Sequence, residues 1–252
     1  METDLTVELG VPGGRPVLSG IVRVGGTLGV QGAAFARSLS LPDLGAAGTL
    51  HVNDGTDLLD LPGLTEVGGV WFGGRLASWL ETPALLRVTG DARVFGPDFA
   101  AWNAAVLEEI GATLTHVAGP FSANVTFPAL LVVGGDLDLG LTDQCPLEPC
   151  EEGPFGPPGY DLGGLERVGG ALRLIGTRTV ERFSLPRLGA AGALEIASNR
   201  ALAALELPAV AGAVGEVRIV DNPALPACQA EDIAARAGAA VTVVERNGPA
   251  CE

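Results

Sequence analysis

The sequence predicts an all-β fold: a single right-handed parallel β-helix, or leucine-rich-repeat-like solenoid, of about nine coils of roughly 22 residues. Three observations support this prediction. A short alternating segment recurs at a nearly constant interval, a second such segment that often ends at a proline precedes it, and glycine pairs stand between the two. Alternation with a period of two over four or five residues is typical of a strand with one buried face.

The recurring segment indicates the length of a coil. Its first apolar positions are 28, 50, 70 or 71, 92, 114, 137, 172, 194 and 217. Most intervals are 20 to 23 residues, and the interval of 35 residues from 137 to 172 corresponds to one coil plus about 13 further residues. We therefore expect coils over 18–220, with an acidic, proline-rich loop inserted at about 143–160.

The preceding segment is expected to form another strand of each coil. Examples are Leu39–Pro42, Leu59–Pro62, Phe183–Pro186 and Leu205–Pro208. Proline stands where the strand ends because it has no N–H group for a continuing ladder. The glycine pairs at 25–26, 68–69, 134–135 and 169–170 are expected either to supply turn dihedrals closed to other residues or to leave room for the backbone of a neighbouring coil.

Both ends of the solenoid are expected to be covered, because an open coil exposes an aggregation-prone edge. We assign residues 1–17 to an N-terminal cap and 221–252 to a C-terminal cap, within one domain over 1–252. The C-terminal cap is predicted to contain a short helix over Gln229–Ala237 with Ile233 facing inward, and a strand over Val241–Val244.

The four cysteines fall into two local pairs, which predicts the disulfides Cys145–Cys150 and Cys228–Cys251. Four cysteines allow three connectivities, and a zinc site is the alternative, disfavoured because no histidine lies near a cysteine. Two disulfides indicate an oxidising compartment, so the expected localisation is secreted, periplasmic or at the cell surface. The acidic start of the chain lacks the basic and apolar regions of a signal peptide.

Charge and composition argue against several classes of protein. The 252 residues carry 30 acidic and 15 basic side chains, a formal net charge of −15, so binding to nucleic-acid phosphates is not expected. No run of 18 apolar residues is present, and no membrane insertion is expected. The apolar content of 47% is too high for a disordered chain. We expect a monomer.

No catalytic or cofactor-binding residues are predicted. The chain has two histidines, no lysine and no Gly-x-Ser-x-Gly segment. His51 and His116 lie three coils apart, so they are not expected to act as a pair; His51 is assigned to a strand face and His116 to a partly buried strand position.

An oxygen-rich group of side chains forms the candidate metal site. Asp136, Asp138 and Asp143 are the candidates for a calcium site, since hard cations prefer carboxylate oxygens. No EF-hand pattern accompanies them, so a solvated acidic loop is favoured and no metal is assigned.

Short motifs recur at fixed places in the coils. They are the Leu-Pro-x-Leu turns, the Val-Gly-Gly-x-Leu segments and the Asn-x-x-Leu segments: Leu41–Leu44, Leu61–Leu64, Leu185–Leu188, Val133–Leu137, Val168–Leu172, Asn199–Leu202 and Asn222–Leu225. In these motifs the chain resembles the receptor L-domain family, whose leucine-rich-repeat-like right-handed β-helix occurs in receptor ectodomains and in bacterial and fungal surface proteins. The Asn-Pro-x-Leu-x-x-Cys segment near the C-terminus resembles bacterial secreted members. The resemblance implies non-catalytic binding or a structural role, and transfers no specific binding residues.

The expected function is that of a secreted or cell-surface module that binds a protein or a glycan through one strand face. A β-helix polysaccharide-active enzyme is one alternative, with Asp91, Arg93, Asp136, Asp138 and Arg173 in a groove, although the coils are short for a cleft. A purely structural envelope protein is another. Trp71, Trp79 and Trp102, in consecutive coils, are assigned to the core in preference to sugar stacking. The candidate binding face consists of Thr49, His51, Arg93, Thr115, Asp138, Arg173, Glu195 and Arg218.

Overall fold

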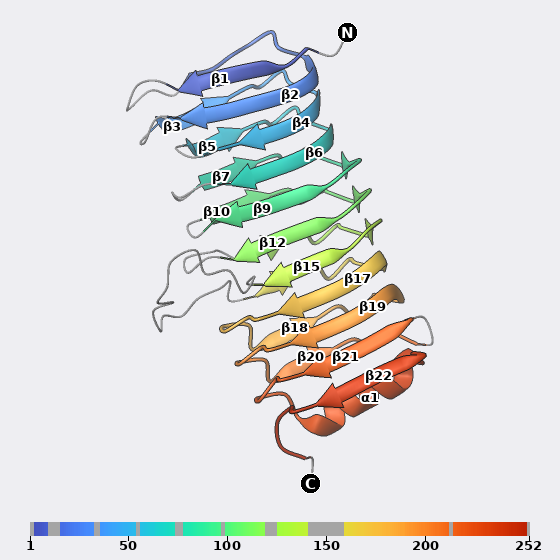
Figure 1. Cartoon of the computed structure of the whole chain (residues 1–252). Helices are drawn as coiled ribbons and strands as arrows, with labels where there is room; N and C mark the ends of the chain where they lie inside the picture. Colours follow the sequence, from blue (N-terminus) through green and yellow to red (C-terminus); the bar gives the residue numbers. More distant parts are fainter. Residues whose placement is uncertain are drawn as a thin grey trace.

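The chain folds as an all-β parallel solenoid of about nine turns, with one short helix near the C-terminus (Figure 1). The computed structural model describes residues 3–9, 16–32, 36–53, 56–73, 78–96, 99–118, 125–140, 159–211 and 214–250. Strands of successive coils lie side by side and pair in parallel, so each coil buries its apolar edge against the next one.

The main sheet has 14 strands and runs along the whole solenoid. Its strands are β1 (Leu5–Leu9), β2 (Arg23–Gly32), β4 (Ala46–Val52), β6 (Glu66–Gly73), β8 (Arg87–Val88), β9 (Ala92–Gly96), β11 (Glu109–Ile110), β12 (Leu114–Ala118), β14 (Val132–Val133), β15 (Leu137–Gly140), β17 (Arg167–Ile175), β19 (Ala190–Ala197), β21 (Glu216–Val220) and β22 (Val241–Glu245).

A second sheet is formed by the strands that precede the proline turns. It has six strands: β3 (Ala36–Ser40), β5 (Thr56–Asp60), β7 (Ser78–Glu81), β10 (Phe99–Asn103), β13 (Val125–Thr126) and β16 (Tyr160–Asp161). β18 (Arg182–Ser184) and β20 (Ala204–Glu206) form a separate two-stranded sheet in the later coils.

The coils contain a short strand that the sequence pattern does not predict. β8, β11 and β14 are two residues long and pair with one another before the corner that leads to β9, β12 and β15. In β2 and β17 the short strand merges with the following one, and the register shifts between them, as between Val168 and Ala171. Two residues are too few to show alternation, so the sequence suggests two strands where the coil has three.

The register of the main sheet confirms the predicted repeat. Leu50 pairs with Leu28 on one side and with Val70 on the other, which assigns the inward position of that coil to Val70 and not to Trp71. Leu137 pairs with Leu172, so the ladder continues directly across the long interval between them. The inward residues paired in this register, such as Leu28, Leu50 and Val70, belong to a thin aliphatic core.

The glycine pairs leave room for the neighbouring coil. A Cβ atom placed on Gly68 would collide with the carbonyl oxygen of Gly48, one on Gly134 with that of Gly111, and one on Gly169 with that of Gly134. None of the four glycine pairs has a positive φ. Of the two expected roles, close approach of the backbone is therefore confirmed, and turn dihedrals closed to other residues are wrong.

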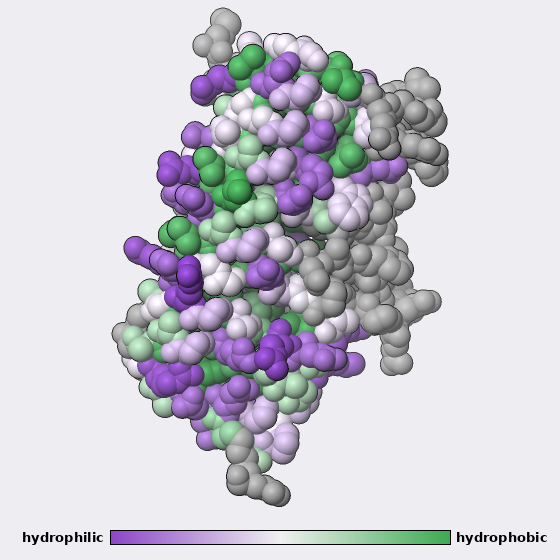
Figure 2. Space-filling view, turned by 180° about the vertical axis from the view of Figure 1, so that it is seen from behind, coloured by the Kyte–Doolittle hydropathy of each residue, from purple (hydrophilic) through white to green (hydrophobic). Residues whose placement is uncertain are grey.

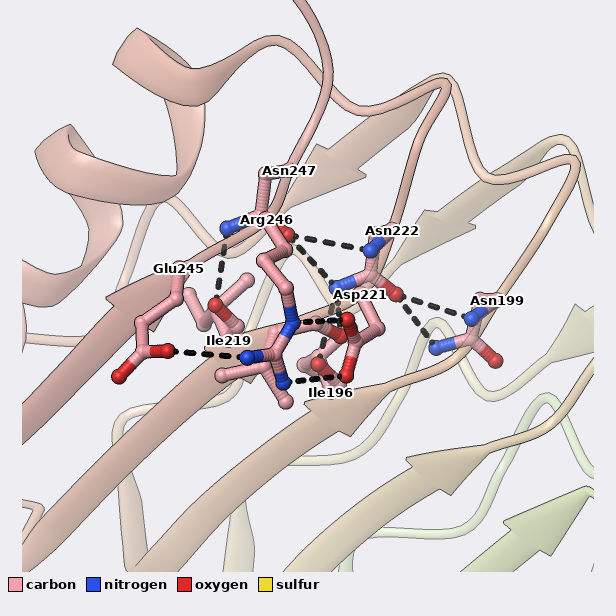
Figure 3. Close-up of polar contacts among 9 residues, drawn as sticks. Ile196, Asn199, Ile219, Asp221, Asn222, Glu245, Arg246 and Asn247 are labelled. Carbon is pink, nitrogen blue, oxygen red and sulfur yellow. Dashed lines mark hydrogen bonds and ion pairs between the residues drawn. The ribbon is translucent and has the colours of Figure 1, made fainter.

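Three asparagines form a ladder in the last coils (Figure 3). The Nδ2 atom of Asn199 donates to Oδ1 of Asn222 at 3.0 Å, and Nδ2 of Asn222 donates to Oδ1 of Asn247 at 3.0 Å. Nδ2 of Asn222 also reaches the carbonyl oxygen of Ile196 at 3.0 Å, and Nδ2 of Asn247 that of Ile219 at 2.8 Å. The ladder thus connects each coil to the one before it through side chains that are partly or fully buried.

The residue before each ladder asparagine, and Gly176 before Thr177 one coil earlier, bends the chain at the end of a strand. Gly176, Ser198, Asp221 and Arg246 directly follow β17, β19, β21 and β22, and all have positive φ, between 50° and 70°. This left-handed conformation costs least in glycine, and three of the four corners hold other residues. The same left-handed corner thus recurs in four successive coils although only one of them has a glycine there.

The C-terminal region contains the expected helix and strand. Helix α1 (Ala227–Ala237) begins two residues before the predicted start, buries Ile233 to 1% exposure, and packs against β21 and β22. β22 pairs in parallel with β21, and at the other end β1 pairs in parallel with β2. Among the described residues, no helix has the length and apolar character needed to cross a bilayer.

Three of the four cysteines, Cys145, Cys150 and Cys251, lie outside the described residues, as does the predicted insertion up to residue 158. Cys228 lies in the first turn of α1 and is not a free thiol. The pairings Cys145–Cys150 and Cys228–Cys251 stay predictions.

Candidate functional site

Seven of the eight predicted face residues lie in one row across consecutive strands of the main sheet. Register pairs connect each member to the next, with Trp71 filling the one position that the prediction left out: His51, Trp71, Arg93, Thr115, Asp138, Arg173, Glu195 and Arg218. We call these eight residues the outer row. At a strand spacing of about 4.8 Å, it extends over roughly 34 Å of the solenoid.

The eighth predicted residue, Thr49, lies in the adjacent outward-facing row. It pairs with Thr27 and Gly69, two positions before His51 along β4. Thr49 and His51 point to the same side of the sheet because they are separated by two residues in a strand. All members of the outer row are partly or fully exposed.

The N-terminal part of the outer row is aromatic. The rings of His51 and Trp71 lie 4.3 Å apart, centroid to centroid, at an interplanar angle of 90°. Phe95, two residues after Arg93 on the next strand, lies 6.2 Å from Trp71 at 45°. We call His51, Trp71 and Phe95 the aromatic cluster. It links three successive coils through side chains on the outside of the sheet.

The C-terminal part of the outer row is a chain of ion pairs. Nη1 of Arg173 donates to Asp136 and to Asp138, at 2.8 Å in both cases. Glu195 lies 3.8 Å from Nε of Arg173 and 3.4 Å from Nε of Arg218. Each of these charges therefore faces a charge of opposite sign on a neighbouring coil.

Hydrogen bonds within this ion-pair chain stabilise the ionised form of Asp136. The N–H group of Ala171 donates to Asp136 at 2.8 Å, and this bond, followed by that from Arg173, lowers the pKa of Asp136. The hydrogen bonds from Asp138 and Asp136 raise the pKa of Arg173. A general acid needs a carboxyl group whose pKa is raised toward neutrality, so Asp136 is unsuited to that role.

The five residues of the alternative enzymatic groove do share one side of the sheet, but they form two separate groups. Asp91 and Arg93 pair at 2.9 Å within β9 and the residue before it. Asp136, Asp138 and Arg173 form the other group, and the uncharged Thr115 lies between the two in the outer row. The structure thus brings the predicted charges together as ion pairs along a sheet.

Two of the three calcium candidates share a cationic partner. Asp136 and Asp138 both accept hydrogen bonds from Arg173, which occupies the space between them, and Asp143 lies outside the described residues. Within the described residues, no group of three or more His, Cys, Asp or Glu side chains could hold a metal ion.

His116 does not belong to the binding face. It is 1% exposed and lies in an inward row between Val94 and Leu139. Its Nδ1 atom lies 3.5 Å from the hydroxyl of Tyr160, and burial lowers the pKa of its imidazole to about 4. The sequence places it on a strand correctly, but only the packing shows that it is a core residue.

The three tryptophans lie in three different environments. Trp102 is buried, with Nε1 donating to Oγ1 of Thr82 at 2.9 Å, as the core assignment predicts. The core assignment is wrong for Trp79, which is 49% exposed on β7 of the second sheet, and for Trp71, which lies in the outer row. An interval of 22 residues back from Ala92 points to Val70 as the inward residue and so to Trp71 as an outward one. Residues 70–72 are all apolar, however, so alternation does not show which of them face inward.

Comparison with protein-family models, curated proteins and solved structures finds no match to this chain. The geometry of the outer row is therefore the basis for the functional proposal that follows.

Proposed function

We propose that this chain is a non-catalytic binding module, secreted or at the cell surface, that recognises a protein or a glycan through the outer row. The observation that carries the proposal is the register: strands of eight consecutive coils present eight side chains of six types in one line, aromatic at one end and charged at the other. A rigid scaffold with a varied outer row is the arrangement that solenoid proteins use for extended binding surfaces.

The alternative of a polysaccharide-active enzyme is less well supported by the charges. Arg173 is shared between Asp136 and Asp138, and Arg93 is paired with Asp91, at distances of 2.8 and 2.9 Å. The hydrogen bonds from the N–H group of Ala171 and from Arg173 lower the pKa of Asp136, which makes this carboxyl group a poor proton donor to a leaving group. A purely structural role would require no particular chemistry in the outer row.

The resemblance to receptor L-domains is consistent with this proposal. The Leu-Pro turns and the Asn-x-x-Leu segments on which it rests occupy repeated structural positions, and Asn199 and Asn222 belong to the asparagine ladder. We extend the proposal to membership of that family, to a monomeric state and to an extracellular or periplasmic location, where the two predicted disulfides would persist.

The proposal is tested by comparing two faces of the same protein. The intact chain is applied to an array of oligosaccharides and to purified surface proteins, together with a variant of the outer row (W71A, R93A and T115A) and a matched variant of the second sheet (W79A, E81A and N103A). We expect at least one ligand whose binding is lost in the outer-row variant and kept in the matched variant.

Two results would contradict the binding proposal. One is equal binding of every ligand by both variants, which would place recognition elsewhere. The other is the release of reducing ends from soluble polysaccharides by the intact chain, abolished by a substitution such as Asp138→Asn, which would identify an enzyme.

A further inference from the structure

Building on the proposed binding function, we infer that the aromatic cluster of the outer row is a carbohydrate subsite, in which one face of an uncharged pyranose ring stacks on the indole of Trp71. The inference commits the binding surface to one class of ligand, a neutral glycan, and to one place along the 14-stranded sheet.

The first argument is the orientation of the indole. A Cβ atom placed on Gly73 would lie 2.8 to 3.4 Å from three atoms of the six-membered ring of Trp71. The ring therefore lies flat along its own strand, over the glycine two residues later. An indole that lies flat on a sheet presents its opposite face outward, which is the orientation needed to stack on a sugar ring.

The second argument is that neighbouring side chains hold this orientation. His51 meets the indole at an interplanar angle of 90° from the preceding strand, and Phe95 lies beside it on the following strand. With a ring on either side and Gly73 below, the indole loses little further freedom when a ligand binds. Preorganisation of this kind increases affinity because fewer rotamers are frozen on binding.

The third argument is that hydrogen-bonding groups surround the indole of Trp71. Arg93 follows Trp71 in the outer row, and its guanidinium is held by Asp91 at 2.9 Å while half of its side chain stays exposed. Thr49 lies on the preceding strand, in the adjacent outward row. A fixed donor, a fixed carboxylate acceptor and a hydroxyl around an aromatic ring match the alternating C–H and O–H groups of a sugar.

The fourth argument is charge. Asp91 and Arg93 cancel each other, and Thr49, Trp71 and Phe95 carry no charge. An anionic or cationic polymer would gain little from this part of the surface, whereas a neutral glycan matches it.

A protein partner fits this place less well than a sugar does. Protein interfaces depend on apolar side chains gathered into a buried core. The strongly exposed large apolar side chains of the described residues, among them Trp79, Leu86 and Val106, lie outside the aromatic cluster. On the reverse side of the molecule, apolar and polar residues are interspersed (Figure 2).

The test is a titration of the intact chain with neutral six-unit oligosaccharides of glucose, xylose and mannose, and with oligogalacturonate as the anionic probe. Binding is measured by calorimetry and by tryptophan fluorescence. We expect saturable binding of at least one neutral oligosaccharide, weakened about tenfold by Trp71→Ala and much less by Trp71→Phe, which retains a stacking ring. The matched substitution Trp79→Ala, in the exposed tryptophan of the second sheet, is expected to leave the affinity within about twofold.

Salt provides a second measurement. Because the recognised ring is uncharged, affinity for the neutral oligosaccharide should change less than about twofold between 0.05 and 0.5 M salt. Thermal unfolding of Trp71→Ala, compared with the unaltered chain, establishes that the variant is folded.

Each contrary outcome has a distinct meaning. Binding of oligogalacturonate alone, binding that Trp71→Ala leaves unchanged, or no binding of any oligosaccharide overturns the carbohydrate subsite. If no sugar binds but an outer-row variant loses a protein ligand, the proposed binding function stands without the subsite. If neither sugars nor proteins bind through the outer row, both proposals fail.

Discussion

At the scale of single residues, His116 is the clearest example of a side chain whose properties depend on its surroundings. It lies in the inward row between Val94 and Leu139, and burial lowers the pKa of its imidazole to about 4, compared with an ordinary value of 6.5. The hydroxyl of Tyr160 lies 3.5 Å from it, and burial raises the pKa of that phenol. The buried imidazole is therefore neutral at pH 7.

This depressed pKa predicts a loss of stability on acidification. Well above pH 6.5 the imidazole is neutral in both states. As the pH falls through 6.5 toward about 4, the unfolded chain takes up the proton first, so the free energy of unfolding decreases. The contribution of His116 to this decrease is on the order of 3 kcal/mol. It should be absent in His116→Leu, which also suits the apolar neighbours.

Urea unfolding of both proteins between pH 4 and 8 tests the prediction, because the difference between the two curves removes contributions from the carboxylates. If the two stability curves run parallel through this range, the imidazole is not buried in its neutral form.

At the scale of structural elements, the coils are held together by contacts that recur at the same position of each coil. The close approach of successive coils at glycine positions is one of them. Gly90→Ala should destabilise the fold by about 2 kcal/mol, because its Cβ atom would lie 2.5 Å from the carbonyl oxygen of Gly68 and the coils would have to separate locally.

Gly45→Ala is the matched control for this substitution. Its Cβ atom would have its nearest neighbour at 3.7 Å, an ordinary contact distance, so we expect a change below about 0.5 kcal/mol. Chemical denaturation of the two variants makes the comparison, and similar losses in both would contradict the explanation by close approach of the coils.

The asparagine ladder is the second recurring contact. Asn222→Ala removes the acceptor used by Asn199 and the donor used by the carbonyl oxygens of Ile196 and Val220, all of them buried in the last coils. Leaving several buried polar groups without partners should lower the free energy of unfolding by about 3 kcal/mol.

Asn103→Ala is the control for the ladder, because Asn103 is exposed and donates to Glu81 at 2.7 Å on the second sheet. We expect a loss below about 1 kcal/mol for this variant, measured by the same thermal or chemical unfolding. Equal losses in Asn222→Ala and Asn103→Ala would mean that burial adds nothing to the ladder.

At the scale of the whole molecule, the stacking of coils converts a one-dimensional repeat into a continuous outer surface. Asp138 and Arg173 are 35 residues apart, yet they pair across adjacent strands because the inserted residues leave the ladder at Leu137 and Leu172 intact. Although the chain has a net charge of −15, stacking places an arginine of a neighbouring coil beside each acidic residue of the outer row.

Much of the architecture could be predicted from the sequence because its cause is periodic. A coil of about 22 residues cannot bury its own apolar edge, so in-phase leucines and valines indicate stacking before any contact is known. The same phase placed seven of the eight candidate face residues in a single row, since a parallel register places equivalent positions side by side. The helix near Ile233 followed from its amphipathic spacing.

Other features were decided only by the tertiary structure. The run Val70-Trp71-Phe72 is apolar at three successive positions, so its alternation cannot be read from the sequence. The pairing of Val70 with the inward residues Leu50 and Ala92 shows that Trp71 faces outward. The glycine pairs are visible in the sequence, but their role depends on the distance to the next coil. The alternation of the sequence predicts which side chains share a face of the sheet. Packing between coils determines which of these side chains are buried, which form ion pairs and which stay exposed to a ligand.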